Sequence, residues 1–186
     1  MNSLRRRITA GLAAVATALT GGLVLTPAAS AAPEEPVATA TISDADTVSA
    51  DALPAPQMNG VVWQQKVVGS TVYAVGNFSK ARPAGSAEGQ NEVNRTHILA
   101  YNIDTGALLP FAPTLNGQVY DVEVSPDGKT LYIVGTFTTV NGQGRSRAAA
   151  FDTATGALKT WRPVLNYNAT VVAVTDATVY IGGMFT

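Results

Sequence analysis

The chain has 186 residues, 46% of them hydrophobic and 13% charged, a balance typical of an ordered domain rather than a disordered chain. The formal net charge is -1, and nine basic against 13 acidic residues follow position 31, which argues against an electrostatic nucleic-acid or membrane-surface binder. The absence of cysteine excludes disulfides, thiolate nucleophiles and cysteine-ligated metal sites.

The first 31 residues have the three zones of a secretory signal peptide. Arg5–Arg7 give a positive start, residues 8–25 are apolar and uncharged, and Ala29–Ala31 fits the small-x-small rule for cleavage. We therefore predict cleavage between Ala31 and Ala32, and a secreted or cell-surface mature chain.

A retained membrane anchor and the twin-arginine export route are the alternatives for this segment. A bilayer span needs roughly 20 apolar residues, whereas this run is interrupted by Gly21–Gly22 and three threonines. Leu4 stands where a twin-arginine signal usually has Ser or Thr, so the general secretory route is the default. We expect no membrane span after cleavage.

Residues 32–56 are predicted to form a disordered linker. The stretch is rich in alanine, proline and threonine, carries five acidic residues and no basic one, and lacks aromatic residues. Its small apolar surface is too little to offset the entropy lost on ordering.

After the linker the sequence repeats itself, which is its most informative feature. Tyr73 and Tyr132 are 59 residues apart, Tyr132 and Tyr180 are 48 apart, and the difference falls in loops. One unit is therefore about 48 residues long, with insertions confined to loops. Three segments recur in the same order: Val72–Ser79, Leu131–Thr138 and Val179–Thr186; Ala100–Pro113 and Ala150–Pro163; and the stretches that start at Asn59, Asn116 and Asn166.

Each unit contains four short strand signals and no helix signal. In the second unit the predicted strands cover residues 119–124, 131–139, 148–152 and 158–162, with turn sequences such as Ser-Pro-Asp-Gly between them. Four antiparallel strands in about 48 residues is the pattern of a β-propeller blade. We predict an all-β fold with blade one over residues 57–113, blade two over 114–163 and half of blade three over 164–186.

The predicted array holds about 2.5 blades, whereas closed propellers have about four to eight. Such an array leaves an apolar face and a strand edge uncovered. We expect either that the sequence is a fragment of a longer gene product or that copies of the chain associate.

Three glycines and five aromatic residues occupy equivalent positions in the units. A glycine inside a strand indicates a bulge or a close backbone approach, and the aromatic residues are predicted to pack between neighbouring blades, two of them on the outermost strand. The glycines are Gly76, Gly135 and Gly183; the phenylalanines two residues later are Phe78, Phe137 and Phe185; the outermost pair is Phe111 and Trp161.

These motifs give the chain a family resemblance over residues 59–186. The sequences SPDGKTLYIVGTF, VNGQGR and AAAFDTATGALKTWRP resemble secreted bacterial β-propeller proteins with YVTN-like or delta-60-like repeats. The resemblance implies a blade array and specifies no activity, because such propellers serve many roles.

The same stretch is similar to the quinoprotein dehydrogenase repeat, whose docking motif places a tryptophan after Thr-Gly. The match is imperfect, because four residues rather than three separate Gly156 from Trp161 and the other copy has Phe111 instead of tryptophan. A propeller enzyme, either a quinone-dependent oxidoreductase or a lyase with its site in blades outside this sequence, is therefore the alternative function.

No catalytic or metal-ligating constellation is apparent in the sequence, so no cofactor and no metal is predicted. His97 is the single histidine, and carboxylates such as Asp127 and Asp152 lie in turns, where they bond backbone amides. This favours a binding module for a protein or a glycan over an enzyme.

One loop breaks the repeat, since residues 81–95 are nine residues longer than their counterpart. Because propeller ligands commonly meet loops at one face, this loop and the corresponding loop of the second unit are candidate binding surfaces. The candidate residues are Arg82, Glu88, Asn91, Arg95, Arg145 and Arg147.

Overall fold

The computed structural model describes residues 52–186; the predicted signal peptide with its Ala31–Ala32 cleavage site and most of the predicted linker lie outside the described residues. The described part is all-β, with thirteen strands and no helix. The strands are β1 (Gln57–Met58), β2 (Val61–Val68), β3 (Thr71–Asn77), β4 (Lys80–Arg82), β5 (Val93–Asn94), β6 (Ile98–Asn102), β7 (Val119–Val124), β8 (Thr130–Gly135), β9 (Thr139–Val140), β10 (Gln143–Gly144), β11 (Ala148–Asp152), β12 (Ala169–Val174) and β13 (Val179–Gly183).

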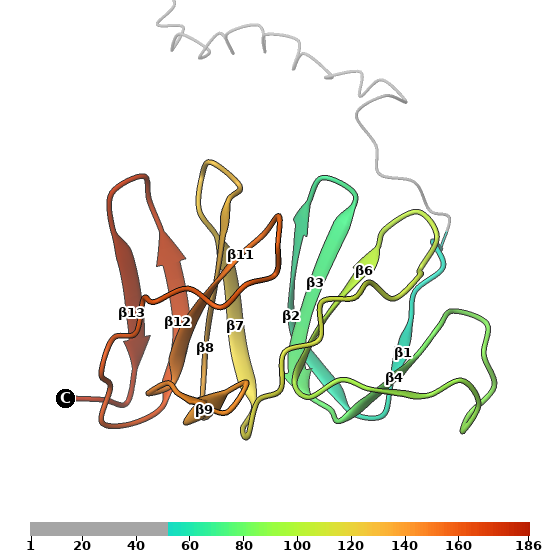
Figure 1. The fold of residues 1–186 in the computed structure, drawn as a ribbon, viewed down its shortest axis with the longest axis horizontal. Coiled ribbons are helices and arrows are strands. Elements are labelled where there is room, and N and C mark those ends of the chain that lie inside the picture. The colour runs from blue at the N-terminus through green and yellow to red at the C-terminus, as the bar shows by residue number, and fades with distance from the viewer. Residues whose placement is uncertain (1–51) are drawn as a thin grey trace, which may run out of the picture. The chain divides into compact units, whose positions relative to one another are not determined.

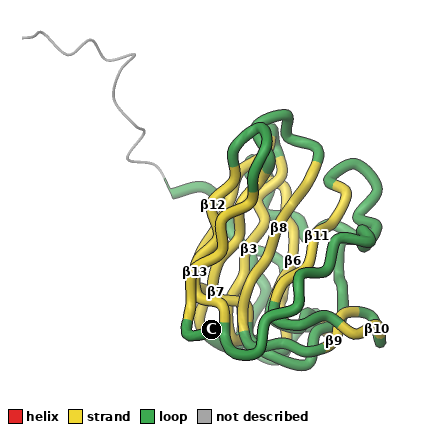
Figure 2. Tube along the Cα trace, turned by 90° about the vertical axis from the view of Figure 1, so that its left-hand side faces the viewer, coloured by secondary structure: helices red, strands yellow, loops and turns green. Residues whose placement is uncertain are grey.

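Three larger antiparallel sheets stand side by side (Figure 1). The first sheet has the order β2–β3–β6, the second β7–β8–β11, and the third contains β12 and β13. Two smaller sheets, β1–β4–β5 and β9–β10, are antiparallel hairpin extensions of the first two units. Figure 2 shows the larger sheets as stacked layers, with the β9–β10 hairpin at one end.

The hydrophobic core lies between the sheets. The largest cluster joins Tyr73, Val75 and Ile98 of the first sheet to Ile133 and Phe151 of the second. A smaller cluster joins the second sheet to the third. Each larger sheet therefore packs face to face with the next, because its central strand is apolar on both faces, as in a sheet buried on both sides.

Phe78, Phe137 and Phe185 follow the second strands of the three larger sheets, and the last two pack between sheets. Phe137 is fully buried in the cluster between the first two sheets, and Phe185 packs against the cluster between the second and third. Phe78 is buried on the other face of the first sheet, with Ala74 and Leu99.

The predicted fourth strand differs from the structure. Leu108 and Leu158 each form one isolated bridge, to Tyr101 and Phe151, and no continuous strand follows. Arginine side chains explain the difference, because the Arg145 guanidinium donates to Lys159 O at 3.0 Å and the equivalent Arg95 guanidinium to Leu109 O at 3.2 Å. These carbonyls are bonded by side chains instead of by a neighbouring strand.

Phe111 and Trp161 therefore lie outside any strand, yet they pack between sheets. The Phe111 ring is 5.3 Å from the rings of both Tyr73 and Phe151, edge to face in each case. Trp161 makes the corresponding contact with Tyr132 at 5.1 Å. Such edge-to-face pairs stabilise beyond the area that they bury.

The last four residues assigned to the linker, 53–56, lie against the first sheet. Pro56 is buried, and a pocket wall is formed by Leu53–Ala55 together with Val67 and Tyr101. Gly106 permits this contact, because a Cβ atom there would lie 2.6 Å from Pro54 O.

Candidate functional site

The first strands of the three larger sheets each contain a β-bulge at the same place. The register shifts between Val62 and Gln64 in β2, between Val119 and Asp121 in β7, and between Ala169 and Val171 in β12. The extra residue is Trp63, Tyr120 or Thr170, respectively. Bulges change the direction of a side chain and are frequent beside functional sites.

The repeated glycines lie opposite these bulges and allow the two strands to approach. A Cβ atom at Gly76 or Gly135 would lie 2.0 Å from the carbonyl oxygen of Val61 or Gln118, and one at Gly183 would lie 2.3 Å from Asn168 O. The close approach explains why glycine recurs at this position in all three units.

An asparagine just before the first strand of each larger sheet bonds the segment that follows the second strand; we call this arrangement the asparagine clamp. Asn116 Oδ1 accepts hydrogen bonds from the Thr138 and Thr139 amides at 2.8 and 2.9 Å, and Asn116 Nδ2 donates to Thr138 Oγ1 at 2.7 Å. Asn59 makes the same bonds to Ser79 and Lys80. Asn166 bonds both the amide and the hydroxyl of Thr186.

The three bulge residues line one open groove together with Met184. The groove has a volume of about 300 Å³, and its lining is predominantly apolar. Trp63 is 52% exposed and Met184 62% exposed, values that are high for such large apolar side chains. An exposed aromatic and apolar patch of this kind is typical of a ligand or partner site.

Two polar contacts fix the strands that carry the groove relative to one another. Lys66 of β2 pairs with Glu123 of β7 at 2.5 Å. Asp121 of β7 accepts a hydrogen bond from the Val172 amide of β12 at 2.9 Å. Trp63, Tyr120 and Thr170 thus lie on three first strands that contact one another in sequence order.

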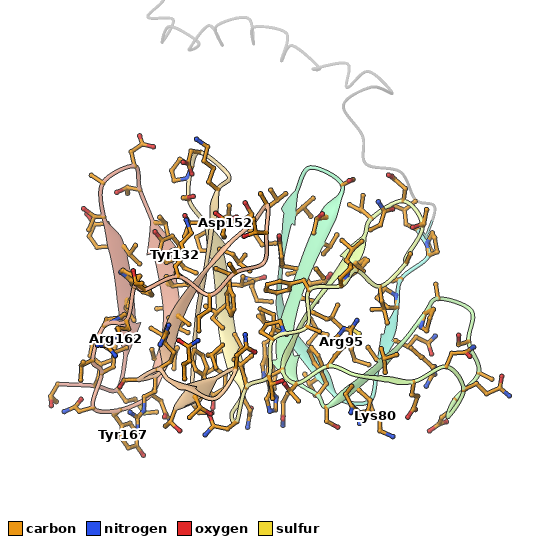
Figure 3. All side chains as sticks on the ribbon, viewed as in Figure 1. Lys80, Arg95, Tyr132, Asp152, Arg162 and Tyr167 are labelled. Carbon is orange, nitrogen blue, oxygen red and sulfur yellow. The ribbon has the colours of Figure 1, made fainter. Side chains whose placement is uncertain are left out.

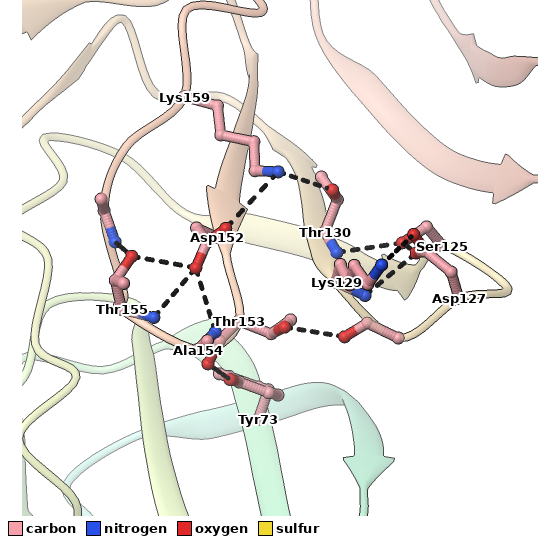
Figure 4. A network of polar contacts seen from close by, with 12 residues as sticks. Tyr73, Ser125, Asp127, Lys129, Thr130, Asp152, Thr153, Ala154, Thr155 and Lys159 are labelled. Atoms are coloured by element: carbon pink, nitrogen blue, oxygen red, sulfur yellow. Dashed lines mark hydrogen bonds and ion pairs between the residues drawn. The ribbon is translucent and has the colours of Figure 1, made fainter.

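A second hollow of about 500 Å³ lies between the first two sheets, next to Tyr73, Phe111 and the turn at residues 153–156. Its polar neighbours already bond one another (Figure 4). Asp152 Oδ1 accepts bonds from the Ala154 and Thr155 amides and from Thr155 Oγ1. The Tyr73 hydroxyl donates to Thr153 O at 3.3 Å.

The acidic groups of this region behave as turn residues. Hydrogen bonds from Thr155 lower the pKa of Asp152, and the Ser125 hydroxyl lowers the pKa of Asp127. Burial, with a smaller contribution from Asp152, raises the pKa of the Tyr73 phenol. None of these shifts prepares a proton donor or acceptor near neutral pH, which a general acid or base would need.

Three of the four arginines predicted as binding residues donate to backbone carbonyl groups. Arg145 is buried and reaches Gly144 O and Lys159 O, and Arg95 reaches Asn94 O and Leu109 O. Arg147 donates to Leu165 O at 2.9 Å. These guanidinium groups bond the chain that follows the third strand of the first two larger sheets, and none of them lines the groove.

The remaining predicted binding residues lie along the long β4–β5 hairpin. Arg82 bonds the Gln57 side chain, Glu88 is exposed, and the Asn91 amide lies 3.4 Å from Ser86 Oγ. Figure 3 shows Lys80 of this hairpin and Asp152 near opposite ends of the sheets. None of the six predicted binding residues lines the groove, since Arg95, Arg145 and Arg147 bond backbone carbonyls and the other three lie along the hairpin.

His97 is in the left-handed region at φ 67°, as is the equivalent Arg147 at φ 66°. Its amide donates to Phe78 O and its carbonyl accepts from the Gly76 amide, both at 2.9 Å. Burial lowers the pKa of the imidazole. His97 is thus a structural residue at the junction between the hairpin and β6.

Sequence reasoning missed Trp63 and Tyr120 as functional candidates. The sequence carried one indication, the spacing of apolar residues. Val119 and Val122, like Ala169 and Val172, are three positions apart, and the structure buries both members of each pair, whereas a regular strand buries every second residue. This spacing requires a bulge, but a strand with mixed apolar and polar residues does not reveal it before the partner strand is known.

Residues 52–186 contain no group of three His, Asp or Glu side chains placed to hold a metal ion. The same residues contain no helix of the length and apolarity that a membrane crossing requires. Comparison with known proteins finds no matching family model, no matching curated protein and no matching solved structure.

Proposed function

We propose that this chain is a secreted or cell-surface β-propeller module that binds a glycan in the groove formed by Trp63, Tyr120, Thr170 and Met184. The observation that carries the proposal is the row of bulges, which turns one residue from each of three consecutive first strands toward the same open groove. The predicted export signal supports a ligand outside the cell.

The propeller arrangement is supported by three features of the described residues. Units of about 48 residues give sheets that pack face to face, with the first strands of successive sheets side by side. In a propeller these first strands face the axis. The groove would then open toward that axis.

The chemistry of the groove favours a glycan. A sugar ring has an apolar face of C–H groups that packs on an exposed aromatic ring, and Trp63 offers such a ring. Tyr120 and Thr170 line the same groove and carry hydroxyl groups; the Thr170 hydroxyl donates to Gly182 O at 3.3 Å and keeps its lone pairs as acceptors. The mildly acidic chain after position 31 disfavours strongly anionic ligands.

Intrinsic fluorescence tests the proposal directly, because the chain has two tryptophans, Trp63 and Trp161. Replacing Trp161 with Phe, the residue that the first unit carries at this position, leaves Trp63 as the reporter. We expect saturable fluorescence changes on titration with soluble cell-wall glycan fragments or neutral oligosaccharides, and loss of binding to immobilised glycans in Trp63→Ala.

The control is Val164→Ala, which removes an 88% exposed apolar side chain that does not line the groove. It should bind like the parent chain. If Trp63→Ala still binds glycan like the parent chain, the groove is not the glycan-binding site. If the Trp63 fluorescence responds to a protein ligand and to no glycan, the groove is a protein-binding surface and the proposal of a glycan ligand is wrong.

A further inference from the structure

The strand β7 has one edge that pairs with no strand, and this edge lies beside the groove. In the order β7–β8–β11, β7 pairs with β8 alone. The groove is lined by residues from three sheets that pack face to face, so it crosses these sheets at the edges of their first strands. The first strands β2 and β12 lie on either side of β7.

The alternation of peptide groups identifies the residues that face the free edge of β7. The Ser125 amide donates to Thr130 O at 2.8 Å and therefore points toward β8. Peptide groups alternate along an antiparallel strand. Glu123 consequently faces β8, whereas Val122 and Val124 direct their amides and carbonyls to the free edge.

Side chains of β7 itself occupy the amides at this edge. Asp121 Oδ1 accepts a hydrogen bond from the Val122 amide at 2.8 Å, and Glu123 Oε1 accepts one from the Val124 amide at 2.9 Å. Within residues 52–186, no hydrogen bond reaches the carbonyl oxygens of Val122 and Val124. The backbone of the free edge therefore offers acceptors to a ligand and no donors.

Asp121 adds a negative charge that no basic side chain balances. Glu123 pairs with Lys66 at 2.5 Å, whereas no ion pair within residues 52–186 includes Asp121. Asp121 directly follows Tyr120, which lines the groove. The carboxylate therefore lies next to the site, together with the free carbonyl groups.

The size of the groove brings this edge into contact with a longer ligand. The groove volume of about 300 Å³ is at the lower end for small-molecule sites. An oligosaccharide of several rings that places one ring on Trp63 therefore extends onto the strand edges beside the groove.

We propose that the groove selects oligosaccharides of amino sugars over the matching N-acetylated sugars, because the free edge of β7 presents carbonyl acceptors and the Asp121 carboxylate. The inference rests on the proposed glycan function. A protonated amino group has three donors and no acceptor, whereas a hydroxyl group has both. A uronic acid brings a second carboxylate, which Asp121 repels.

The test is a fluorescence titration of the full chain carrying Trp161→Phe with three tetramers, of glucosamine, N-acetylglucosamine and a uronic acid. At pH 6 and low ionic strength the amino groups are protonated. We expect the glucosamine tetramer to bind about three- to tenfold more tightly than the N-acetylglucosamine tetramer, and the uronic acid tetramer most weakly. Adding about 0.5 M sodium chloride should remove most of these differences.

A variant of Asp121 assigns the preference to this residue. Asp121→Asn removes the charge and keeps an oxygen for the Val122 amide. The quantity to compare is the ratio of the affinities for the glucosamine and N-acetylglucosamine tetramers, because a general loss of affinity leaves this ratio unchanged. The ratio should fall toward one. Glu88→Gln is the matched control, since it removes the same charge from an exposed residue outside the groove and should keep the ratio.

Three results would overturn the inference: equal or tighter binding of the N-acetylglucosamine tetramer, a preference that salt does not reduce, or an unchanged ratio in Asp121→Asn. In each of these cases binding that depends on Trp63 leaves the proposed function standing. Absence of binding by all three tetramers also overturns the inference, whereas the proposed function fails only if no neutral glycan binds in the groove.

Discussion

The Asp121 carboxylate and the Val172 amide, 51 positions apart in the sequence, are joined by a 2.9 Å hydrogen bond that links the second sheet to the third. The other carboxylate oxygen accepts a bond from the Val122 amide at 2.8 Å. One side chain thus connects the backbones of two first strands at the level of the bulges.

Replacing Asp121 with alanine should loosen the third sheet. A hydrogen bond to a charged group contributes about 1.5–3 kcal/mol, and the Val172 amide would lose its partner. We expect faster hydrogen exchange at Val172 and a lower midpoint of urea unfolding. Glu123→Ala is the matched control, since Glu123 pairs with the part-exposed Lys66 and such pairs contribute less than about 1 kcal/mol. Equal losses in both variants would contradict this role.

The asparagine clamp of the second unit should contribute to stability. Asn116→Ala removes two backbone bonds and one side-chain bond, and we expect a loss of about 1–3 kcal/mol in the free energy of unfolding. Asn94→Ala is the control, because Asn94 is an exposed strand residue, so its cost should be smaller. Urea titrations of the two variants give the comparison, and the reverse order would disprove it.

Gly135→Ala should be among the most destabilising substitutions in the chain. The new Cβ would lie 2.0 Å from Gln118 O, so β7 and β8 must separate at the bulge. We expect a loss of about 3 kcal/mol, at the upper end of the usual range for overpacking. Gly144→Ala is the control, because no heavy atom lies within 4 Å of its added Cβ. The midpoints of thermal unfolding of the two variants provide the comparison. Similar midpoints would show that β7 and β8 can separate at the bulge at little cost in stability.

His97 should make stability depend on pH. Burial lowers the imidazole pKa below its ordinary value of 6.5, so the folded state binds a proton less readily than the unfolded state. Its contribution to stability is full above pH 6.5 and is lost as the pH falls through the folded-state pKa. Asp127 and Asp152, whose pKa values are lowered from 3.8, lose theirs in a more acidic range.

The variant His97→Asn isolates this dependence, because asparagine tolerates positive φ and does not titrate. Between pH 7 and 5 its thermal midpoint should fall less than that of the parent chain. Parallel curves for the two proteins would mean that the imidazole exchanges protons equally in the folded and unfolded states.

Export should leave a mature N-terminus at Ala32. The prediction rests on the charged, apolar and small-residue zones of the first 31 residues. Intact mass measurement and N-terminal sequencing of protein from the culture medium provide the check. Met1 retained in a membrane fraction would indicate an anchor instead.

The strands were predictable where local sequence alone decides them. Residues 119–124 and 148–152 were predicted as strands and form β7 and β11 with the same bounds. Residues 158–162 were predicted as a strand from their composition, but the Arg145 guanidinium donates a hydrogen bond to the Lys159 carbonyl, which a strand pairing would otherwise use. That outcome depends on a side chain 14 positions earlier, which no local pattern reports.

The candidate site was less predictable than the strands. The sequence directed attention to arginines in loops, because charge in a loop is a usual sign of binding. The structure bonds Arg95 and Arg145 to carbonyl groups and exposes Trp63 at a bulge. Whether Trp63 faces the core or the solvent depends on a one-residue shift against β3, and a shift of one residue reverses the face of a side chain.

The asparagine clamps also bear on how long the protein remains chemically intact. Asn59, Asn116 and Asn141 each precede a glycine. In this sequence the following backbone nitrogen most easily attacks the side-chain carbonyl carbon of asparagine, expels ammonia and forms a cyclic imide, which water then opens to a carboxylate. In the folded chain all three side-chain oxygens accept backbone hydrogen bonds, Asn141 from the Thr114 amide at 2.8 Å. We therefore expect these three asparagines to deamidate more slowly in the folded chain than in the unfolded chain, and to react when their hydrogen bonds open.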